Sequence, residues 1–228
     1  NNIDNDVQIS DSFFQKSVIK NTNNSFILNN SVLYKLNNYI YNDSVKNSII
    51  NNCLLIDSKK GFYYNKSFNN NIINSIFINN KNAFYINKNN TGYIKFYNNL
   101  FIKNNIAINN LDSCQLYIIN NTFYNNNTAL KGLLNKKISN KIISKNNIYD
   151  NNTLNFDLNK LNISNSYCIS NTDTLMGYYN IYSSPLYINI KKHNYNLKLN
   201  SPGIRSGINN TNLGVNINDI NIIKYLKY

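Results

Sequence analysis

The sequence of 228 residues contains no tryptophan and no glutamate, and it has only two prolines, seven glycines and one methionine. All ten acidic residues are therefore aspartates, set against 23 lysines and arginines, which gives a formal charge of +13. A basic surface of this kind attracts uronic-acid polysaccharides, other anionic glycans, nucleic acid or anionic lipid without choosing among them. Because glycine and proline are scarce, other residues must form the turns.

Cysteine is also scarce, and long apolar runs are absent. Cys53, Cys114 and Cys168 lie far apart without a CxxC pair, which argues against a disulfide framework and against zinc, so we predict three buried thiols and no metal site. No stretch reaches about 18 uninterrupted apolar residues, so no membrane span is predicted. Nucleotide-binding loops are missing too, and the lone His193 is expected to be solvated rather than catalytic.

Asparagine makes up about a quarter of the chain and recurs in pairs at a nearly constant step. Seven asparagines are the centres of the predicted ladder, namely Asn30, Asn52, Asn74, Asn99, Asn121, Asn147 and Asn165, and all but Asn74 and Asn165 adjoin another asparagine. The residue two positions after each centre is always apolar or aromatic: Val32, Leu54, Ile76, Phe101, Phe123, Tyr149 and Tyr167. The steps between centres are 22, 22, 25, 22, 26 and 18 residues, which is typical of a stacked repeat.

Each repeat unit contains short apolar runs rich in Ile, Phe and Tyr that are separated by Asn. Such runs favour strands, and Asn tolerates the left-handed conformation of tight bends. A second column of polar residues supports the same stacking: Asp57, Asn79, Asn104, Asn126 and Asn152, with Lys35 in the first coil. The sequence therefore predicts an all-β, right-handed parallel β-helix of about seven to eight coils, in preference to a β-sandwich or a disordered Asn-rich tract.

Two features resemble secreted right-handed parallel β-helix proteins of the pectate-lyase-like superfamily. One is the repeat that spans Ile119 to Ala129; the other is a pair of C-terminal blocks, residues 180–188 and 195–207, each of which contains one of the two prolines. The resemblance covers about residues 11–207 and implies three sheets and a C-terminal block that closes the last coil. Ser184 and Arg205 stand where that family usually has aspartate.

The predicted domain organisation is β-helix coils over residues 1–175, followed by a last coil and capping segment over residues 176–228, where the Asn period ends. The chain starts at Asn1 without an initiator methionine, so we expect a mature or trimmed protein. Together with the resemblance, this leads us to expect a secreted or cell-surface location.

Catalytic chemistry has few candidates in this sequence. The resemblance implies that a polysaccharide lyase would need calcium held by clustered carboxylates and a basic residue that removes a proton; no other cofactor is expected. Asp150 and Asp157 flank one bend and form the best acidic pair, although turn hydrogen bonds are the favoured explanation for both. A lyase or epimerase that acts on an anionic glycan is therefore kept as the alternative function.

Nineteen tyrosines accompany the asparagines and lysines. Tyr93, Tyr97 and Tyr117 are the candidate substrate-binding residues, because exposed rings beside amides and lysines form a good surface for sugars. Rings that fill the interior are the competing explanation. The main hypothesis is a protein that binds a polysaccharide or anionic glycan without catalysis, or a scaffold within a larger surface protein; nucleic-acid binding is the weakest hypothesis.

Overall fold

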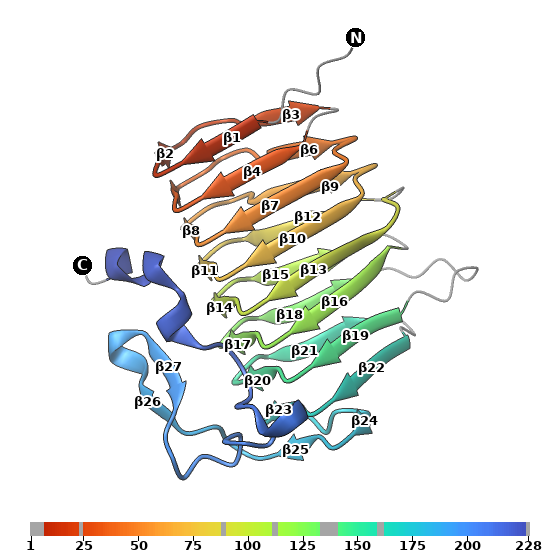
Figure 1. Cartoon of the computed structure of the whole chain (residues 1–228), viewed down its shortest axis with the longest axis vertical. Coiled ribbons are helices and arrows are strands. Elements are labelled where there is room, and N and C mark those ends of the chain that lie inside the picture. The colour runs from red at the N-terminus through yellow and green to blue at the C-terminus, as the bar shows by residue number, and fades with distance from the viewer. Residues whose placement is uncertain are drawn as a thin grey trace.

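The computed structural model describes residues 7–22, 25–87, 90–110, 114–132, 141–158 and 162–226. These residues form a parallel β-solenoid, whose coils stack along one axis (Figure 1). Seven coils contribute a strand to each of three sheets, and two further turns contribute strands to only two of them. The all-β parallel helix predicted from the sequence is confirmed, with a slightly different coil count.

The three sheets are parallel throughout the described residues. Sheet A consists of β1 (Val7–Ser10), β4 (Phe26–Asn29), β7 (Asn47–Asn51), β10 (Asn69–Ile73), β13 (Tyr93–Tyr97), β16 (Gln115–Ile119), β19 (Lys141–Lys145), β22 (Asn162–Ser166) and β24 (Gly177–Tyr178). Sheet B consists of β2 (Phe13–Gln15), β5 (Val32–Tyr34), β8 (Leu54–Ile56), β11 (Ile76–Ile78), β14 (Leu100–Ile102), β17 (Thr122–Tyr124), β20 (Ile148–Asp150), β23 (Ile169–Ser170) and β25 (Ile181–Tyr182). Sheet C consists of β3 (Lys20–Thr22), β6 (Ile40–Asp43), β9 (Phe62–Asn65), β12 (Asn82–Ile86), β15 (Ile106–Asn110), β18 (Thr128–Gly132) and β21 (Leu154–Leu158).

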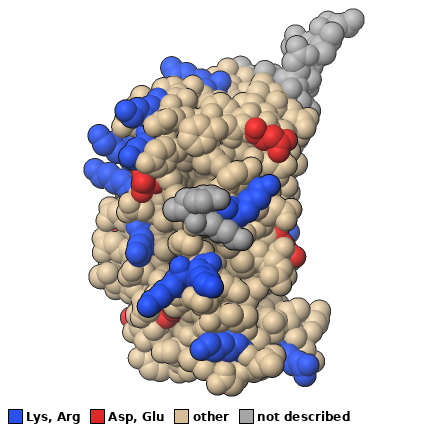
Figure 2. All heavy atoms as spheres, turned by 90° about the vertical axis from the view of Figure 1, so that its left-hand side faces the viewer, with Lys and Arg blue, Asp and Glu red and all other residues tan. Residues whose placement is uncertain are grey.

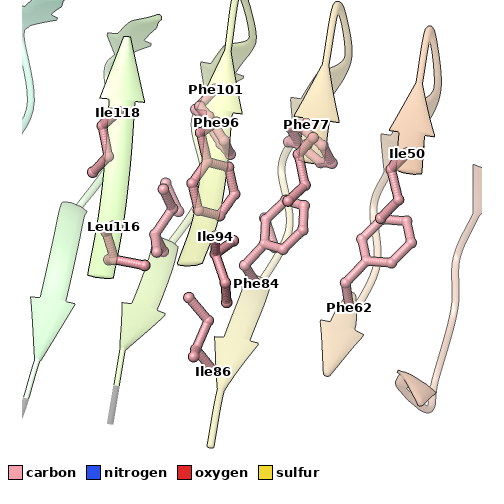
Figure 3. Packing of buried hydrophobic residues seen from close by; sticks show 14 of the residues in the cluster. Ile50, Phe62, Phe77, Phe84, Ile86, Ile94, Phe96, Phe101, Leu116 and Ile118 are labelled. Atoms are coloured by element: carbon pink, nitrogen blue, oxygen red, sulfur yellow. The ribbon is translucent and has the colours of Figure 1, made fainter. Parts of the chain in front are cut away.

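Like side chains stack in the interior. The rings of Phe77, Phe101, Phe123 and Tyr149 lie in one column on sheet B, with successive centroids 4.7 to 5.1 Å apart and nearly parallel planes. Figure 3 shows how inward side chains from facing sheets meet, for example Phe84 with Phe96 and Phe77. Successive residues of a strand point inward and outward in turn. The inward column therefore shows which residues of each sheet B strand face the interior and which face outward.

The register shows that the predicted apolar column is one residue out of step in its second half. Val32, Leu54 and Ile76 align with Leu100 and not with Phe101, so the first three residues face outward. Phe101, Phe123 and Tyr149 each follow the outward position of their strand by one residue, and they face inward. Tyr167 lies in a corner with a φ of 53° and belongs to neither column.

The predicted asparagine ladder splits in the same way at the corner between sheets A and B. Asn30, Asn52 and Asn74 belong to an outer column in the left-handed conformation, which continues through Asn98, Asn120, Asn146 and Tyr167. Asn99, Asn121 and Asn147 belong to the adjacent inner column, which begins with Ser31, Cys53 and Ser75. Asn165 lies in neither, because it pairs with Ser144 inside sheet A.

The corner between sheets B and C repeats this arrangement. Its outer, left-handed column is Lys35, Asp57, Asn79, Lys103, Asn125 and Asn151, and its inner column is Leu36, Ser58, Asn80, Asn104, Asn126 and Asn152. The second column predicted from the sequence therefore mixed outer and inner positions as well. In both inner columns each side-chain oxygen accepts a hydrogen bond from the backbone N–H of the preceding coil, for example Asn99 N–H to Asn121 Oδ1 at 2.9 Å.

The C-terminal arm, residues 186–226, folds back along the outward face of sheet B. It contains the hairpin of β26 (Tyr187–Asn189) and β27 (Asn194–Leu197) and the short 3₁₀ helices η1 (Ile190–Lys192), η2 (Ile208–Asn210), η3 (Ile217–Asp219) and η4 (Asn221–Leu226). Figure 1 shows the arm running from the lower end of the solenoid back towards the N-terminal coils. The sequence predicted a capping segment here; the contacts of the arm run along the side of the solenoid, and the boundary at residue 175 stays a prediction.

Outer-column asparagines hold this arm in place. Asn146, Asn98 and Asn52, each two coils apart, accept backbone N–H groups of the arm through Oδ1, at 3.1, 2.7 and 2.8 Å. Between these bonds, the arm's apolar side chains cover the outward residues of sheet B, and together they form a second hydrophobic cluster. Among the described residues, no helix is long and apolar enough to cross a membrane.

Candidate functional site

The outward face of sheet C carries a cluster of four tyrosines, which we call the tyrosine platform: Tyr39, Tyr41, Tyr63 and Tyr85. Tyr41, Tyr63 and Tyr85 occupy equivalent positions on β6, β9 and β12, because the register pairs each with the next. The Tyr63 and Tyr85 rings stack with centroids 5.6 Å apart and planes within 10°. Tyr39 lies against both of them, at 5.4 and 5.6 Å.

All four rings are partly exposed, and lysines flank them. Lys20 Nζ lies 6.0 Å from the Tyr41 ring centroid, and Lys60 Nζ lies 5.3 Å from that of Tyr39. Each such contact stabilises by about 0.5–1 kcal/mol at an exposed site. The platform therefore combines flat aromatic faces with fixed positive charge at its edge.

An amide row borders the platform on the same sheet. Asn65 Nδ2 donates to Asp43 Oδ1 at 2.8 Å, and Asn87 Nδ2 donates to Asn65 Oδ1 at 3.1 Å and to the Tyr63 hydroxyl at 2.7 Å. These groups are fixed by strand pairing at the spacing of successive coils, about 4.8 Å. A ligand that stacks on the rings would meet a regular line of hydrogen-bonding groups.

Burial favours the protonated form of two platform hydroxyls, those of Tyr39 and Tyr63. It raises the pKa of Tyr39 to about 12, and the neighbouring Tyr85, Tyr41 and Tyr63 hydroxyls add to the increase. Burial also raises the pKa of Tyr63. Phenol groups in this state can donate as well as accept hydrogen bonds, which suits a ligand rich in hydroxyls.

The three tyrosines predicted from the sequence lie on a different surface, the outward face of sheet A. Tyr93 and Tyr97 are on β13 and Tyr117 is on the adjacent β16. The Tyr93 and Tyr117 rings meet edge to face at 5.9 Å, and Lys95 Nζ lies 5.1 Å from the Tyr97 ring. The structure thus brings the three predicted residues together, and their role in binding stays a prediction.

The two predicted acidic residues lie on different sheets. Asp150 ends β20 on sheet B, is 4% exposed and is covered by the arm. Burial raises its pKa to about 6, and the nearby Tyr187 hydroxyl counteracts this only in part. Asp157 lies on sheet C, where its carboxylate pairs with Lys131 Nζ at 2.9 Å.

Within the described ranges, no three His, Cys, Asp or Glu side chains come together in an arrangement that could hold a metal ion. The three cysteines are buried, as predicted, and no disulfide joins them in the described part of the chain. His193 caps η1 with a φ of 54°, and burial, together with the Lys103 charge, lowers its pKa. His193 forms no ion pair with a carboxylate of the described residues.

Positive charge is spread over the face that carries sheet B and the arm. Figure 2 shows Lys and Arg side chains along that face, most densely at its upper left edge, with few aspartates between them. An open groove at the corner between sheets B and C adds further amides to this surface, and it is lined by Lys81, Lys103, Asn105 and Asn127 among others. The basic excess of the sequence is thus a property of the exterior.

Sequence reasoning missed most of the platform, although a signal for it was present. Tyr41, Tyr63 and Tyr85 are spaced by the same 22 residues as Asn30, Asn52 and Asn74. A test of every residue type for that period, and not of asparagine alone, would have found them.

Comparison of the chain with protein-family models and with curated proteins gives no match. The parallel β-solenoid therefore rests on the structure itself. Membership of the pectate-lyase-like superfamily, and with it any activity typical of that superfamily, stays a prediction.

Proposed function

We propose that this protein is a secreted or cell-surface solenoid that binds a polysaccharide without catalysis, either alone or as part of a larger surface protein. The observation that carries the proposal is the tyrosine platform, in which aligned, partly exposed rings repeat along the solenoid axis beside a row of amides. Sugar rings present apolar C–H faces and polar edges, so they match aromatic faces bordered by hydrogen-bonding groups.

A polymer is favoured over a single sugar because the site is repetitive. The column of outward residues on sheet C runs from Lys20 through the three aligned tyrosines, Tyr41, Tyr63 and Tyr85, to Asn109 and Lys131. Its groups repeat at the coil spacing, so an extended chain could contact several coils at once and gain affinity from each. The net charge of +13 would favour an anionic polymer over a neutral one.

A glycan array followed by titration calorimetry with the best ligand tests the proposal. Removing two platform rings together, with Tyr63→Ala and Tyr85→Ala, is expected to weaken binding about tenfold or more. The matched control removes two rings from sheet A, with Tyr93→Ala and Tyr117→Ala, and should leave affinity unchanged. Absence of binding to any glycan would overturn the proposal.

The same variants discriminate between the two tyrosine surfaces. If the sheet A pair loses binding and the platform pair does not, the residues predicted from the sequence form the site.

The assay also includes ultraviolet detection of unsaturated sugar products, because a rising signal would show a lyase and contradict a purely binding role. Antibody labelling of intact cells that express the natural protein tests the proposed location.

A further inference from the structure

The last coil of the solenoid, residues 176–182, carries four of the five most exposed large apolar side chains among the described residues; the fifth is Leu199 on the arm. Met176 is 84% exposed, Tyr178 77%, Tyr179 73% and Tyr182 65%. Large apolar groups clustered at this level of exposure usually mark an interaction surface. Because this surface is far along the chain from the tyrosine platform, the proposed binding of polysaccharide does not account for it.

The exposure has a structural cause. Tyr182 aligns with Ser170 and, one coil earlier, with the buried Tyr149, so it occupies an inward column. It is open to solvent because no further coil lies on it among the described residues. In the sheet orders, β24 and β25 likewise have a neighbour on one side only. Figure 1 shows these strands at the lower end of the molecule. The end coil is thus a cross-section of the core with free strand edges.

The charge around the end coil distinguishes it from the rest of the surface. Residues 163–190 contain one charged side chain, Asp173, in a protein with a formal charge of +13. Two copies would repel each other over most of their basic surfaces but not here. The end coil therefore combines exposed apolar side chains with a stretch of chain that carries little charge.

From these observations we propose that the end coil is a self-association surface, where two copies of the chain join end to end about a two-fold axis. A two-fold arrangement presents the same patch from both copies, so Tyr182 and Tyr178 of one copy meet those of the other, and the assembly closes as a dimer. The free edges of β24 and β25 gain neighbours, and the exposed rings are removed from water. The two tyrosine platforms of such a dimer lie on one long particle, so a polymer could engage both.

Sedimentation velocity over a concentration series tests the dimer. The wild-type protein is expected to show a reversible monomer–dimer equilibrium with a Kd of about 10–100 µM, as suits a small interface. Tyr182→Lys should shift the protein to monomer at every concentration, because it places two like charges at the centre of the interface, whereas Tyr182→Phe should keep the dimer. Tyr97→Lys makes the same charge change on sheet A and should have no effect on assembly.

Spin labels determine the geometry. The native cysteines that the structure describes are buried, so a label on Tyr182→Cys should report a short distance between copies, and a label on Asp11→Cys, in the first coil, a distance beyond the measurable range. A wild-type protein that stays monomeric, a dimer that survives Tyr182→Lys, or open-ended oligomers would each overturn the proposal. Glycan affinity of monomeric Tyr182→Lys should equal that of wild type for a short oligosaccharide, so the dimer and the platform can fail independently.

Discussion

Replacing Asn104 by alanine should be one of the most damaging single changes in this protein. Asn104 is 1% exposed and lies at the middle of the inner column between sheets B and C. Its Oδ1 accepts from the Asn80 backbone N–H at 3.0 Å and from Asn80 Nδ2 at 2.9 Å. Its Nδ2 donates to the Phe77 carbonyl at 2.9 Å and to Asn126 Oδ1 at 3.0 Å. One side chain thus joins three successive coils.

The magnitude follows from the groups that lose their partners. In Asn104→Ala, the Asn80 N–H and one hydrogen of its Nδ2 remain buried without an acceptor, since the other Nδ2 hydrogen still reaches the Leu55 carbonyl. Each stranded donor costs about 1–3 kcal/mol, so the expected loss in the free energy of unfolding is about 2–6 kcal/mol. Because a typical domain has only about 5–15 kcal/mol in total, this is a large fraction.

Two comparison variants isolate the cause. Asn105→Ala changes the neighbouring, exposed residue, whose side chain accepts a bond from Asn127 Nδ2, and should cost less than about 0.5 kcal/mol. Asn104→Ser should lie between the two. Serine already serves at the equivalent place in an earlier coil, where Ser58 Oγ accepts the Leu36 N–H at 3.0 Å, but it cannot supply the donor to the Phe77 carbonyl.

Urea unfolding monitored by far-ultraviolet circular dichroism measures the free energies, and amide hydrogen exchange shows whether the loss is local to coils four to six. The hydrogen bonds of Asn104 predict the order Asn104→Ala, then Asn104→Ser, then Asn105→Ala, from most to least destabilised. If Asn104→Ala and Asn105→Ala differ by less than about 1 kcal/mol, the inner column does not stabilise the solenoid through its hydrogen bonds.

Two further predictions concern the arm. Burial raises the pKa of Asp150 from 3.8 to about 6, so ionisation costs more in the folded state and the stability of the wild type should fall as pH rises from about 4 to 6. Asp150→Asn should remove that fall and stabilise the protein at pH 7 by at most about 3 kcal/mol, measured by urea unfolding across this range; a parallel pH profile in both proteins would contradict it. Asn98→Ala removes the acceptor of the Asn216 N–H and should speed protease cleavage within the arm severalfold. Asn120→Ala is its control, because Asn120 holds the same outer-column position without an Oδ1 hydrogen bond to the arm, and equal cleavage rates would refute the role of Asn98.

The sequence was sufficient for the architecture because the physical signal for stacking is redundant. The 22-residue step of Asn30, Asn52 and Asn74, the short apolar runs and the scarcity of Gly and Pro all indicate one parallel coil per repeat. An error of one position in any single coil does not change that conclusion. The prediction of the fold class is therefore unaffected by errors that make a residue-level assignment wrong.

The register was harder to predict than the fold class, because asparagine suits both the outer and the inner position of a corner. In early coils the corner reads Asn52-Cys53 and Asn74-Ser75, so only the outer residue is asparagine. In the next coil it reads Asn98-Asn99, and the step between equivalent residues is 24 instead of 22. Either asparagine then continues the pattern, and only the strand pairing decides between them.

The arm's position on sheet B had a signal that went unused. Strands such as Leu54–Ile56, Ile76–Ile78 and Leu100–Ile102 are apolar at three consecutive positions, which means that both faces of the strand are covered. Strands of sheet C instead place Tyr41 and Tyr63 outward, between buried residues. What covers sheet B could not be derived locally, because it comes from residues more than 100 positions away, as in the bond from Asn216 to Asn98.

Two explanations are possible for the high asparagine content: a codon bias, or a physical need for the amide side chain. The outer and inner columns at the corners distinguish between these two explanations. The outer columns also hold Lys35, Asp57 and Tyr167, so these positions share a left-handed backbone that residues other than asparagine adopt at moderate cost. The inner columns hold Ser, Cys or Asn at nearly every coil, and from Asn99 and Asn80 onward the amide both accepts a backbone N–H and donates to a carbonyl. Substitution by lysine should therefore be tolerated at outer positions that make no hydrogen bond to the arm, and not at inner ones or at Asn52, Asn98 and Asn146. A nucleotide bias alone would predict no difference between neighbours that share a codon, whereas hydrogen bonding predicts that the inner residue of each pair is the one the fold cannot lose.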